Sequence, residues 1–295
     1  MRSRVAGVLF LPFFVPAMQI WIGTSGYSYP DWVGSFYPPR TSPGRMLALY
    51  CRSFPLVELN FTFYRLPTPS MLARLAEQTP AGFQFIVKLP RTLSHEESER
   101  ELDSFRQAIE ELNRRQRLLG LLCQLPQASR NTLEHRSWIC KLAENLAGYR
   151  LAVEFRHRSW FEEEVPPWLA ENQLDLVAVD VPDIPGLYPR GLVRSGPRVY
   201  VRFHSRQARK WYQSDKQRYD FDFSEAALRE WTDALGGIGA SVDKVLLLFN
   251  NCYRGQAAKN AEQMRVLVER LLPDEEIVRP FAPASMEMEQ RLLFD

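Results

Sequence analysis

The sequence has little cysteine and little histidine, with four residues of each among 295. None of the cysteines stands in a CxxC pair or near a histidine at zinc-finger spacing, which argues against a structural zinc site. We therefore interpret the cysteines as separate core thiols in a reducing compartment, not as a disulfide framework. They are Cys51, Cys123, Cys140 and Cys252.

The sequence also lacks a large excess of charge of either sign, since its formal net charge is +2. This balance excludes a protein whose bulk positive charge alone would bind nucleic acid, although a local basic patch stays open. Hydrophobic residues make up 45% of the chain and charged residues 24%, as in soluble globular proteins. A chain of this length buries a substantial core without disulfides.

The first 17 residues differ from the rest of the chain. Arg2 and Arg4 precede an apolar run, Val5 to Val15, which is too short to span a membrane. The segment is either a signal peptide cleaved after Ala17 or the product of a start codon assigned too early, with Met18 as the true start. We favour Met18, which predicts a cytoplasmic protein without a membrane partner and leaves residues 1–17 outside the folded domain.

Eight short apolar runs follow, and each has the length of a buried strand. Most are continuous instead of alternating, as expected for parallel strands covered on both faces. The runs are 20–23, 56–60, 83–88, 118–123, 151–155, 174–179, 198–203 and 244–249. Helical segments separate them at 43–53, 69–78, 98–116, 131–146, 162–171, 224–235 and 256–272, and only the Pro- and Gly-rich connection 182–197 lacks one.

This alternation predicts an α/β fold, a single (β/α)8 TIM-type barrel over residues 18–280. A doubly wound open sheet is the alternative, but its first strand is usually followed by a GxGxxG phosphate loop. The corresponding loop here is Gly-Thr-Ser-Gly at 23–26, whose spacing does not match. We therefore favour the barrel, with residues 281–295 as a tail beyond it.

Polar or ionisable residues stand at the carboxyl end of every predicted strand, where barrel enzymes build their sites. A buried polar group costs on the order of a few kcal/mol unless it is paired, so this recurrence predicts a pocket. The candidate catalytic residues are Glu58, Lys88, Glu154, His157 and His204. The candidate substrate-binding residues are Ser25, Tyr27, Asn60, Tyr64, Gln124, Arg156, Asp180, Arg202, Asn250 and Asn251.

Seven ordered motifs carry these residues: GTSGYSYPDW (23–32), VELNFTFYRLP (57–67), FIVKLPRTLSH (85–95), CQLP (123–126), VEFRHRSWF (153–161), YVRFH (200–204) and FNN (249–251). Together they resemble the YecE-like family, catalogued as domain of unknown function 72. The resemblance spans about Met18 to Leu272 and implies a TIM barrel in a bacterial or archaeal cytoplasmic protein. It implies no established reaction. Tyr27 departs from the pattern, where Trp is expected more often.

Glu58 and Glu154 are the principal acid/base candidates. Burial raises the pKa of a carboxyl group and a nearby cation lowers it, so two carboxyls in different surroundings can divide acid and base roles. The alternative is that one of them only holds Arg156 or Arg202 in a buried ion pair. Together with Lys88, these arginines predict an anionic substrate such as a sugar phosphate or a nucleic-acid backbone. Hydrolase, isomerase and lyase reactions all fit this pattern.

No cofactor is expected, and the alternative is a bound divalent metal ion. Carboxylate and imidazole ligands for one are available at Glu58, Glu154, Asp180, His157 and His204. The cations predicted in the same mouth argue against a bound metal ion.

The segment 206–219 mixes lysines and arginines with Trp211, Tyr212 and Tyr219. Such a composition is typical of nucleic-acid grooves, although a loop covering the pocket is the more ordinary interpretation. A non-catalytic nucleic-acid or nucleotide-binding protein is therefore the alternative to an enzyme.

The last residues contain Gln-Arg-Leu-Leu-Phe at 290–294, which resembles the QxxLF peptide by which bacterial proteins dock on the DNA sliding clamp. Gln290 would hydrogen-bond at the edge of the clamp pocket while Leu293 and Phe294 fill its apolar part. The other interpretation is that these apolar residues pack back onto the barrel.

Overall fold

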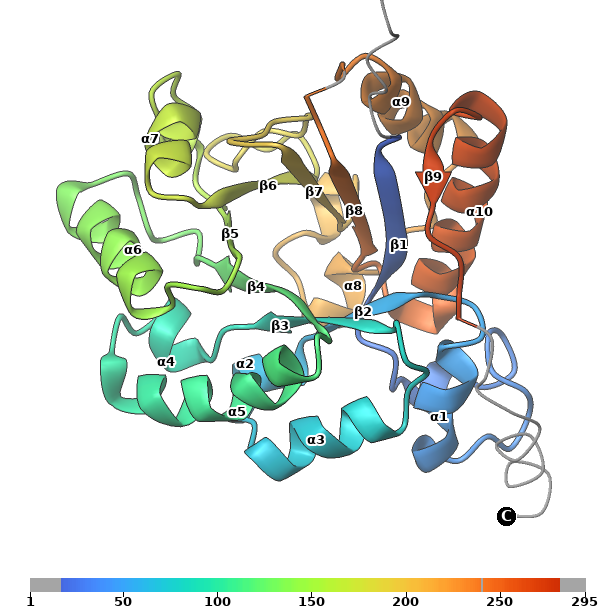
Figure 1. Ribbon diagram of the computed structural model, residues 1–295. Helices are drawn as coiled ribbons and strands as arrows, with labels where there is room; N and C mark the ends of the chain where they lie inside the picture. The colour runs from blue at the N-terminus through green and yellow to red at the C-terminus, as the bar shows by residue number, and fades with distance from the viewer. Residues whose placement is uncertain (1–16, 240, 282–295) are drawn as a thin grey trace, which may run out of the picture.

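The computed structural model describes residues 17–239 and 241–281, and parallel strands form its centre (Figure 1). Each strand pairs with the next along the chain, and β1 pairs with both β2 and β8, which closes the barrel. The strands are β1 (Gln19–Ser25), β2 (Leu56–Leu59), β3 (Gln84–Lys88), β4 (Leu118–Gln124), β5 (Leu151–Glu154), β6 (Asp175–Asp180), β7 (Arg198–Phe203) and β8 (Lys244–Phe249). The predicted (β/α)8 barrel is confirmed.

Helices surround the strands. They are α1 (Pro43–Tyr50), α2 (Phe61–Tyr64), α3 (Pro69–Glu77), α4 (Arg91–Ser94), α5 (Leu102–Arg114), α6 (Leu133–Asn145), α7 (Val165–Glu171), α8 (Asp215–Arg218), α9 (Glu225–Gly236) and α10 (Gln256–Leu271). Short 3₁₀ turns add η1 (Pro30–Trp32), η2 (Glu99–Glu101), η3 (Arg158–Trp160), η4 (Ala208–Lys210) and η5 (Tyr253–Gly255). Residues 181–197, all of them described, contain no helix, as predicted.

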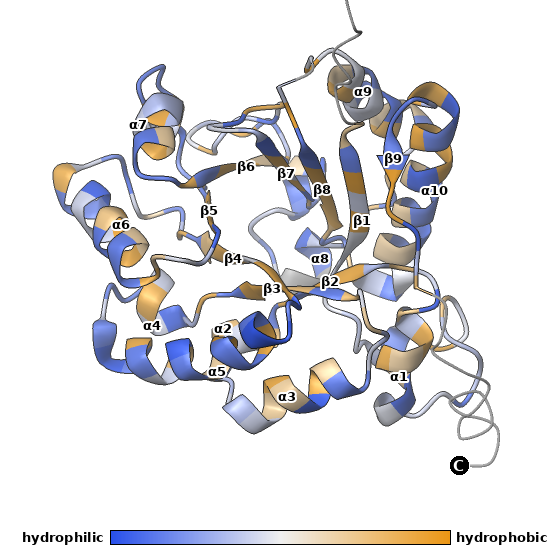
Figure 2. Cartoon of the chain, viewed as in Figure 1, coloured by the Kyte–Doolittle hydropathy of each residue, from blue (hydrophilic) through white to orange (hydrophobic). Residues whose placement is uncertain are grey.

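Side-chain caps fix where several outer helices begin. Thr68, Thr132 and Ser224 each precede a helix and accept a hydrogen bond from the backbone N–H three residues later. Such a cap satisfies one of the otherwise unpaired amides of the first turn. Figure 2 shows apolar residues concentrated in the central strands and mixed with polar residues along the outer helices. In α5 the buried residues stand at helical spacing and are Leu102, Phe105, Ala108, Ile109 and Leu112.

One strand was missed by the sequence pattern. β9 (Glu276–Ile277) follows α10 and pairs in parallel with Gln19 and Ile20 of β1, outside the barrel. A two-residue strand has too little periodicity to be recognised, and its place depends on the amino-terminal part of β1, whose edge β2 leaves unpaired. The short helices α2, α4 and α8 lie in the loops and were not predicted either.

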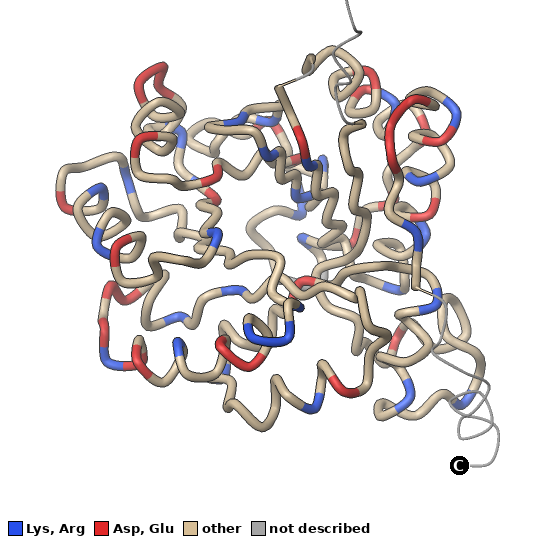
Figure 3. The backbone as a smooth tube through the Cα atoms, viewed as in Figure 1, with Lys and Arg blue, Asp and Glu red and all other residues tan. Residues whose placement is uncertain are grey.

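Acidic and basic residues alternate over the outer helices, as Figure 3 shows. None of the helices in the described ranges combines the length and hydropathy that a membrane crossing requires. The proposed N-terminal extension and tail, residues 1–17 and 281–295, lie outside the described residues except for Ala17 and Phe281.

Candidate functional site

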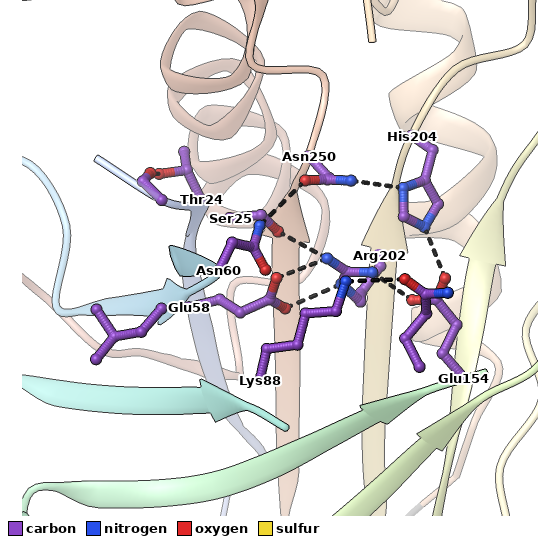
Figure 4. Close-up of polar contacts among 12 residues, drawn as sticks. Thr24, Ser25, Glu58, Asn60, Lys88, Glu154, Arg202, His204 and Asn250 are labelled. Carbon is purple, nitrogen blue, oxygen red and sulfur yellow. Dashed lines mark hydrogen bonds and ion pairs between the residues drawn. The ribbon is translucent and has the colours of Figure 1, made fainter. Parts of the chain in front are cut away.

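Arg202 lies at the centre of the barrel mouth and joins two carboxylates from opposite strands. Its Nε and Nη2 donate to the two oxygens of Glu58 at 2.9 and 2.6 Å, and its Nη1 donates to Glu154 at 2.5 Å (Figure 4). The Nη2 group also lies 3.4 Å from the Ser25 hydroxyl. Both carboxylates and the guanidinium are fully or almost fully buried. The three charges therefore form one rigid unit instead of three separate groups.

Tyr200 adds a further donor to this unit, because its hydroxyl donates to Glu58. Tyr200 and Arg202 stand two residues apart on β7, so both side chains point into the barrel. Tyr200 was missed by the sequence analysis, although this same period of two would have found it. Burial and the neighbouring Glu58 carboxylate raise the pKa of Tyr200 well above its ordinary value, against the opposing effect of the Arg202 guanidinium, so the hydroxyl keeps its proton.

Glu154 is an ion-paired carboxylate. Burial alone would raise the pKa of Glu154, but the Arg156 and Arg202 guanidiniums outweigh this effect and hold the pKa well below its usual range. Arg156 Nε lies 2.6 Å from one oxygen, and Arg202 occupies the other. A carboxylate held in this way at neutral pH is suited to orienting cations more than to exchanging protons.

His204 is buried at the end of β7 and is neutral. Asn250 Nδ2 donates to its Nδ1 at 2.9 Å, and its Nε2 faces a Glu154 oxygen at 3.3 Å. This pattern places the ring proton on Nε2. Burial and the Arg156 guanidinium lower the pKa of His204 to about 3. Asn60 continues the chain of contacts, since its amide lies 3.4 Å from the Asn250 oxygen.

Lys88, at the end of β3, is the cation of the mouth that lacks a carboxylate partner among the described residues. Its ammonium group donates to Gln124 Oε1 at 2.8 Å and lies 4.4 Å from the centre of the Phe63 ring. Burial and the Arg202 guanidinium lower the pKa of Lys88 to about 7. A large fraction of its amine is therefore uncharged near neutral pH.

Two more residues of the mouth were not predicted. His95 packs edge-on against Phe63 at 4.8 Å, and burial together with the Lys88 ammonium lowers the pKa of His95 to about 4. Trp211 is buried with its ring 5.5 Å from the Arg156 guanidinium. His95 closes the motif FIVKLPRTLSH, and the small number of histidines in the chain was the signal that could have identified it.

Several predicted site residues lie elsewhere. Asp180 accepts hydrogen bonds from Arg206 and Trp231, in the wall between β6 and α9. Asn251 donates to Phe221 O and to Asn260, and His157 caps the turn at Ser159.

The two predicted tyrosines lie at the periphery. Tyr64 is 80% exposed on α2, and Tyr27 packs near Tyr50 at 6.1 Å. The structure thus brings together Ser25, Glu58, Asn60, Lys88, Gln124, Glu154, Arg156, Arg202, His204 and Asn250.

The ligands suggested for a divalent metal ion do not assemble. Glu58 and Glu154 hold Arg202, while Asp180 and His157 lie outside this cluster. Within residues 17–239 and 241–281, no group of three or more His, Cys, Asp or Glu side chains is arranged to hold a metal ion.

The basic segment 206–219 covers the mouth, and much of its charge is paired. Arg206 binds Asp180 and Glu230, and Lys210 binds Asp220 at 2.9 Å. Tyr212 reaches the loop after β4, where its hydroxyl accepts a hydrogen bond from Gln127 Nε2 at 2.9 Å. We call residues 205–223 the strap. The peptide containing Gln290, Leu293 and Phe294 lies outside the described residues.

A cavity of about 620 Å³ lies between η1 and η5. Tyr29 and Cys252 line this cavity, and both donate to the backbone oxygen of Ser25. The hydroxyl of the same Ser25 lies 3.4 Å from Arg202 Nη2. The remaining lining residues are Pro30, Asp31, Tyr219, Tyr253 and Arg254. Neither this cavity nor a larger one of about 800 Å³, near α1 and α10, is lined by a predicted site residue.

Residues 21–283 match the family model described as "Protein of unknown function DUF72". The chain is 29% identical over 275 residues to the UPF0759 protein YunF of Bacillus subtilis, an alignment covering 85% of this chain and 95% of the relative. A DUF72 family protein from Thermotoga maritima has a crystal structure that covers 85% of this chain and 99% of its own, at 35% identity and a TM-score of 0.79. One from Enterococcus faecalis covers 85% and 95%, at 25% identity and a TM-score of 0.76.

Proposed function

The chain belongs to the DUF72 family, and we propose that its barrel mouth is the active site of an enzyme acting on a small anionic substrate. In this proposal the Lys88 amine is the reactive group, and Glu58 and Glu154 position the cations around it. This division of roles replaces the acid/base role that the sequence suggested for the two carboxylates.

The observation that carries the proposal is the state of Lys88. An amine with a pKa of about 7 is matched to proton transfer at neutral pH, because it is readily both protonated and deprotonated. Strongly shifted groups at the carboxyl end of a barrel are typical of active sites. Glu58 and Glu154, by contrast, are saturated by arginine contacts.

Arg156 supports an anionic substrate. One edge of its guanidinium binds Glu154, its face lies on Trp211, and its Nη1 makes no hydrogen bond within the described residues. A guanidinium edge of this kind can accept a carboxylate or phosphate through charge-assisted hydrogen bonds.

Calorimetry with inorganic phosphate and with small carboxylates tests the anion site. We expect the full chain to bind at least one of these anions, and Arg156→Gln to weaken that binding at least tenfold. Arg74→Gln removes an exposed arginine on α3 and is the matched control, for which we expect no change. Equal binding by Arg156→Gln, or no anion binding by the full chain, would contradict the proposal. Native mass spectrometry of the purified protein would identify any small molecule that copurifies.

A further inference from the structure

We propose that Lys88 forms a covalent imine with the carbonyl carbon of a small aldehyde or ketone that also carries a carboxylate or phosphate group. This inference rests on the proposed function and names the chemistry of its substrate.

The surroundings of Lys88 leave its lone pair available. Gln124 Nε2 donates to Leu125 O at 2.8 Å, which turns the amide oxygen of Gln124 toward Lys88. That oxygen accepts one N–H of the lysine and does not compete for the nitrogen lone pair. The face of Phe63 supports the same nitrogen from one side. The nitrogen is therefore oriented by an acceptor and a ring, neither of which would keep it protonated as a carboxylate does.

The two nearby carboxylates are engaged elsewhere. Glu58 and Glu154 make their short contacts with Arg202 and Arg156, so they do not form an ion pair with Lys88. The positive charges of Arg202 and Arg156 also act on the amine and favour its neutral form. Desolvation beside other cations is a known way of making a lysine nucleophilic.

The reaction balances without an oxidant or a reductant. The neutral Lys88 amine forms a C–N bond to the carbonyl carbon, and the carbonyl π electrons move to oxygen, which takes up the proton released from nitrogen. The resulting carbinolamine takes one proton from solvent, loses water by breaking its C–O bond, and leaves an iminium ion. Arg156, whose charge acts on Lys88, supplies the contact for the anionic group.

Borohydride trapping tests the inference, because borohydride reduces an imine to a stable secondary amine. The full chain is incubated at pH 7.5 with pyruvate or with dihydroxyacetone phosphate, reduced, and examined by intact-mass and peptide mass spectrometry. Neutral dihydroxyacetone is the matched probe without an anionic group. We expect an adduct on Lys88 with at least one anionic probe, at least tenfold more abundant than with neutral dihydroxyacetone.

Lys88→Met should abolish this adduct, whereas Lys141→Met, which removes a lysine on the outer helix α6, should leave it unchanged. Circular dichroism confirms that each variant is folded. Adducts spread over several lysines, or persisting in Lys88→Met, would overturn the inference. No adduct in a chain that still binds anions through Arg156 would overturn the imine alone, whereas a chain that binds no anion would overturn the proposed function as well. The two probes distinguish a 2-oxo acid from a phosphorylated ketone.

Discussion

Arg202 is buried between two carboxylates, so its side chain cannot be removed without leaving charge unpaired. We expect Arg202→Met to lower the free energy of unfolding by about 3–5 kcal/mol, because Glu58 and Glu154 lose their shared partner. Urea denaturation followed by circular dichroism measures this loss.

A compensating variant separates the charge effect from lost packing. Glu58→Gln and Glu154→Gln, added to Arg202→Met, remove the unpaired charges and should recover part of the lost stability. If the triple variant is no more stable than Arg202→Met alone, the ion-pair explanation is wrong.

Lys88 should titrate near neutral pH. Its pKa is lowered to about 7, so an NMR titration of the ¹³C-dimethylated protein should show one lysine signal moving near pH 7, absent from Lys88→Met. The unfolded chain keeps this proton to about pH 10. It therefore binds more protons than the folded chain between about pH 7 and 10, and the stability of the wild type relative to Lys88→Met should rise with pH across that window. A Lys88 signal that moves only near pH 10 would contradict the burial effect.

The members of the charged cluster could be predicted from the sequence more readily than their pairings. Strand ends identify Glu58, Lys88, Glu154 and Arg202 as neighbours, because all eight strands open at one end of the barrel. Which carboxylate binds which cation depends on side-chain reach across the barrel. For this reason the sequence left open whether a Glu acts as an acid/base or holds an arginine. Asp180 shows the opposite case, since a strand-end residue can turn outward to a helix.

At the scale of elements, the strap links β7 to the opposite side of the mouth. Tyr212 is more than half exposed, yet its hydroxyl bonds Gln127 in the loop after β4, and the neighbouring Trp211 is buried over Arg156. This basic, aromatic segment therefore lies over the charged cluster. Its composition alone could not predict this position, because the ion-pair partners of Arg206 and Lys210 all lie outside the segment 206–219. Contact with nucleic acid stays a prediction.

Tyr212→Phe should loosen the strap without unfolding the barrel. We expect faster amide hydrogen exchange in residues 207–219 and a change in global stability within about 0.5 kcal/mol, as for most exposed side chains. Tyr149→Phe removes another tyrosine hydroxyl that binds Glu110 on α5, and it should leave exchange in the strap unchanged. Unaltered strap exchange in Tyr212→Phe would show that the contact with Gln127 does not hold the strap.

At the scale of the whole molecule, barrel closure was the most predictable property. Eight apolar runs separated by helices leave few arrangements other than a closed parallel sheet. The added strand β9 was unpredictable because it depends on the part of β1 that β2 does not cover: β2 pairs with residues 23–25 of β1, and β9 pairs with residues 19 and 20. The net charge is +2, and residues of both signs are interleaved on the outside of the molecule. The buried cluster of charged side chains is therefore found in the barrel mouth.

The peptide at 290–294 stays a prediction, and it concerns a partner instead of a substrate. The peptide lies after Phe281, the last described residue, and it contains none of the residues of the barrel mouth. Binding of a partner to the peptide can therefore be measured separately from the chemistry of the mouth. We expect the full chain to be retained on an immobilised bacterial sliding clamp and a chain ending at Pro283 to pass through. Leu293→Ala with Phe294→Ala should weaken retention at least tenfold, because apolar anchors contribute most of such binding energy. Glu289→Ala is the matched control outside the QxxLF pattern and should bind as the full chain does. Equal retention of the full and shortened chains, or retention of neither, would exclude the clamp as a partner while leaving the chemistry at Lys88 untouched.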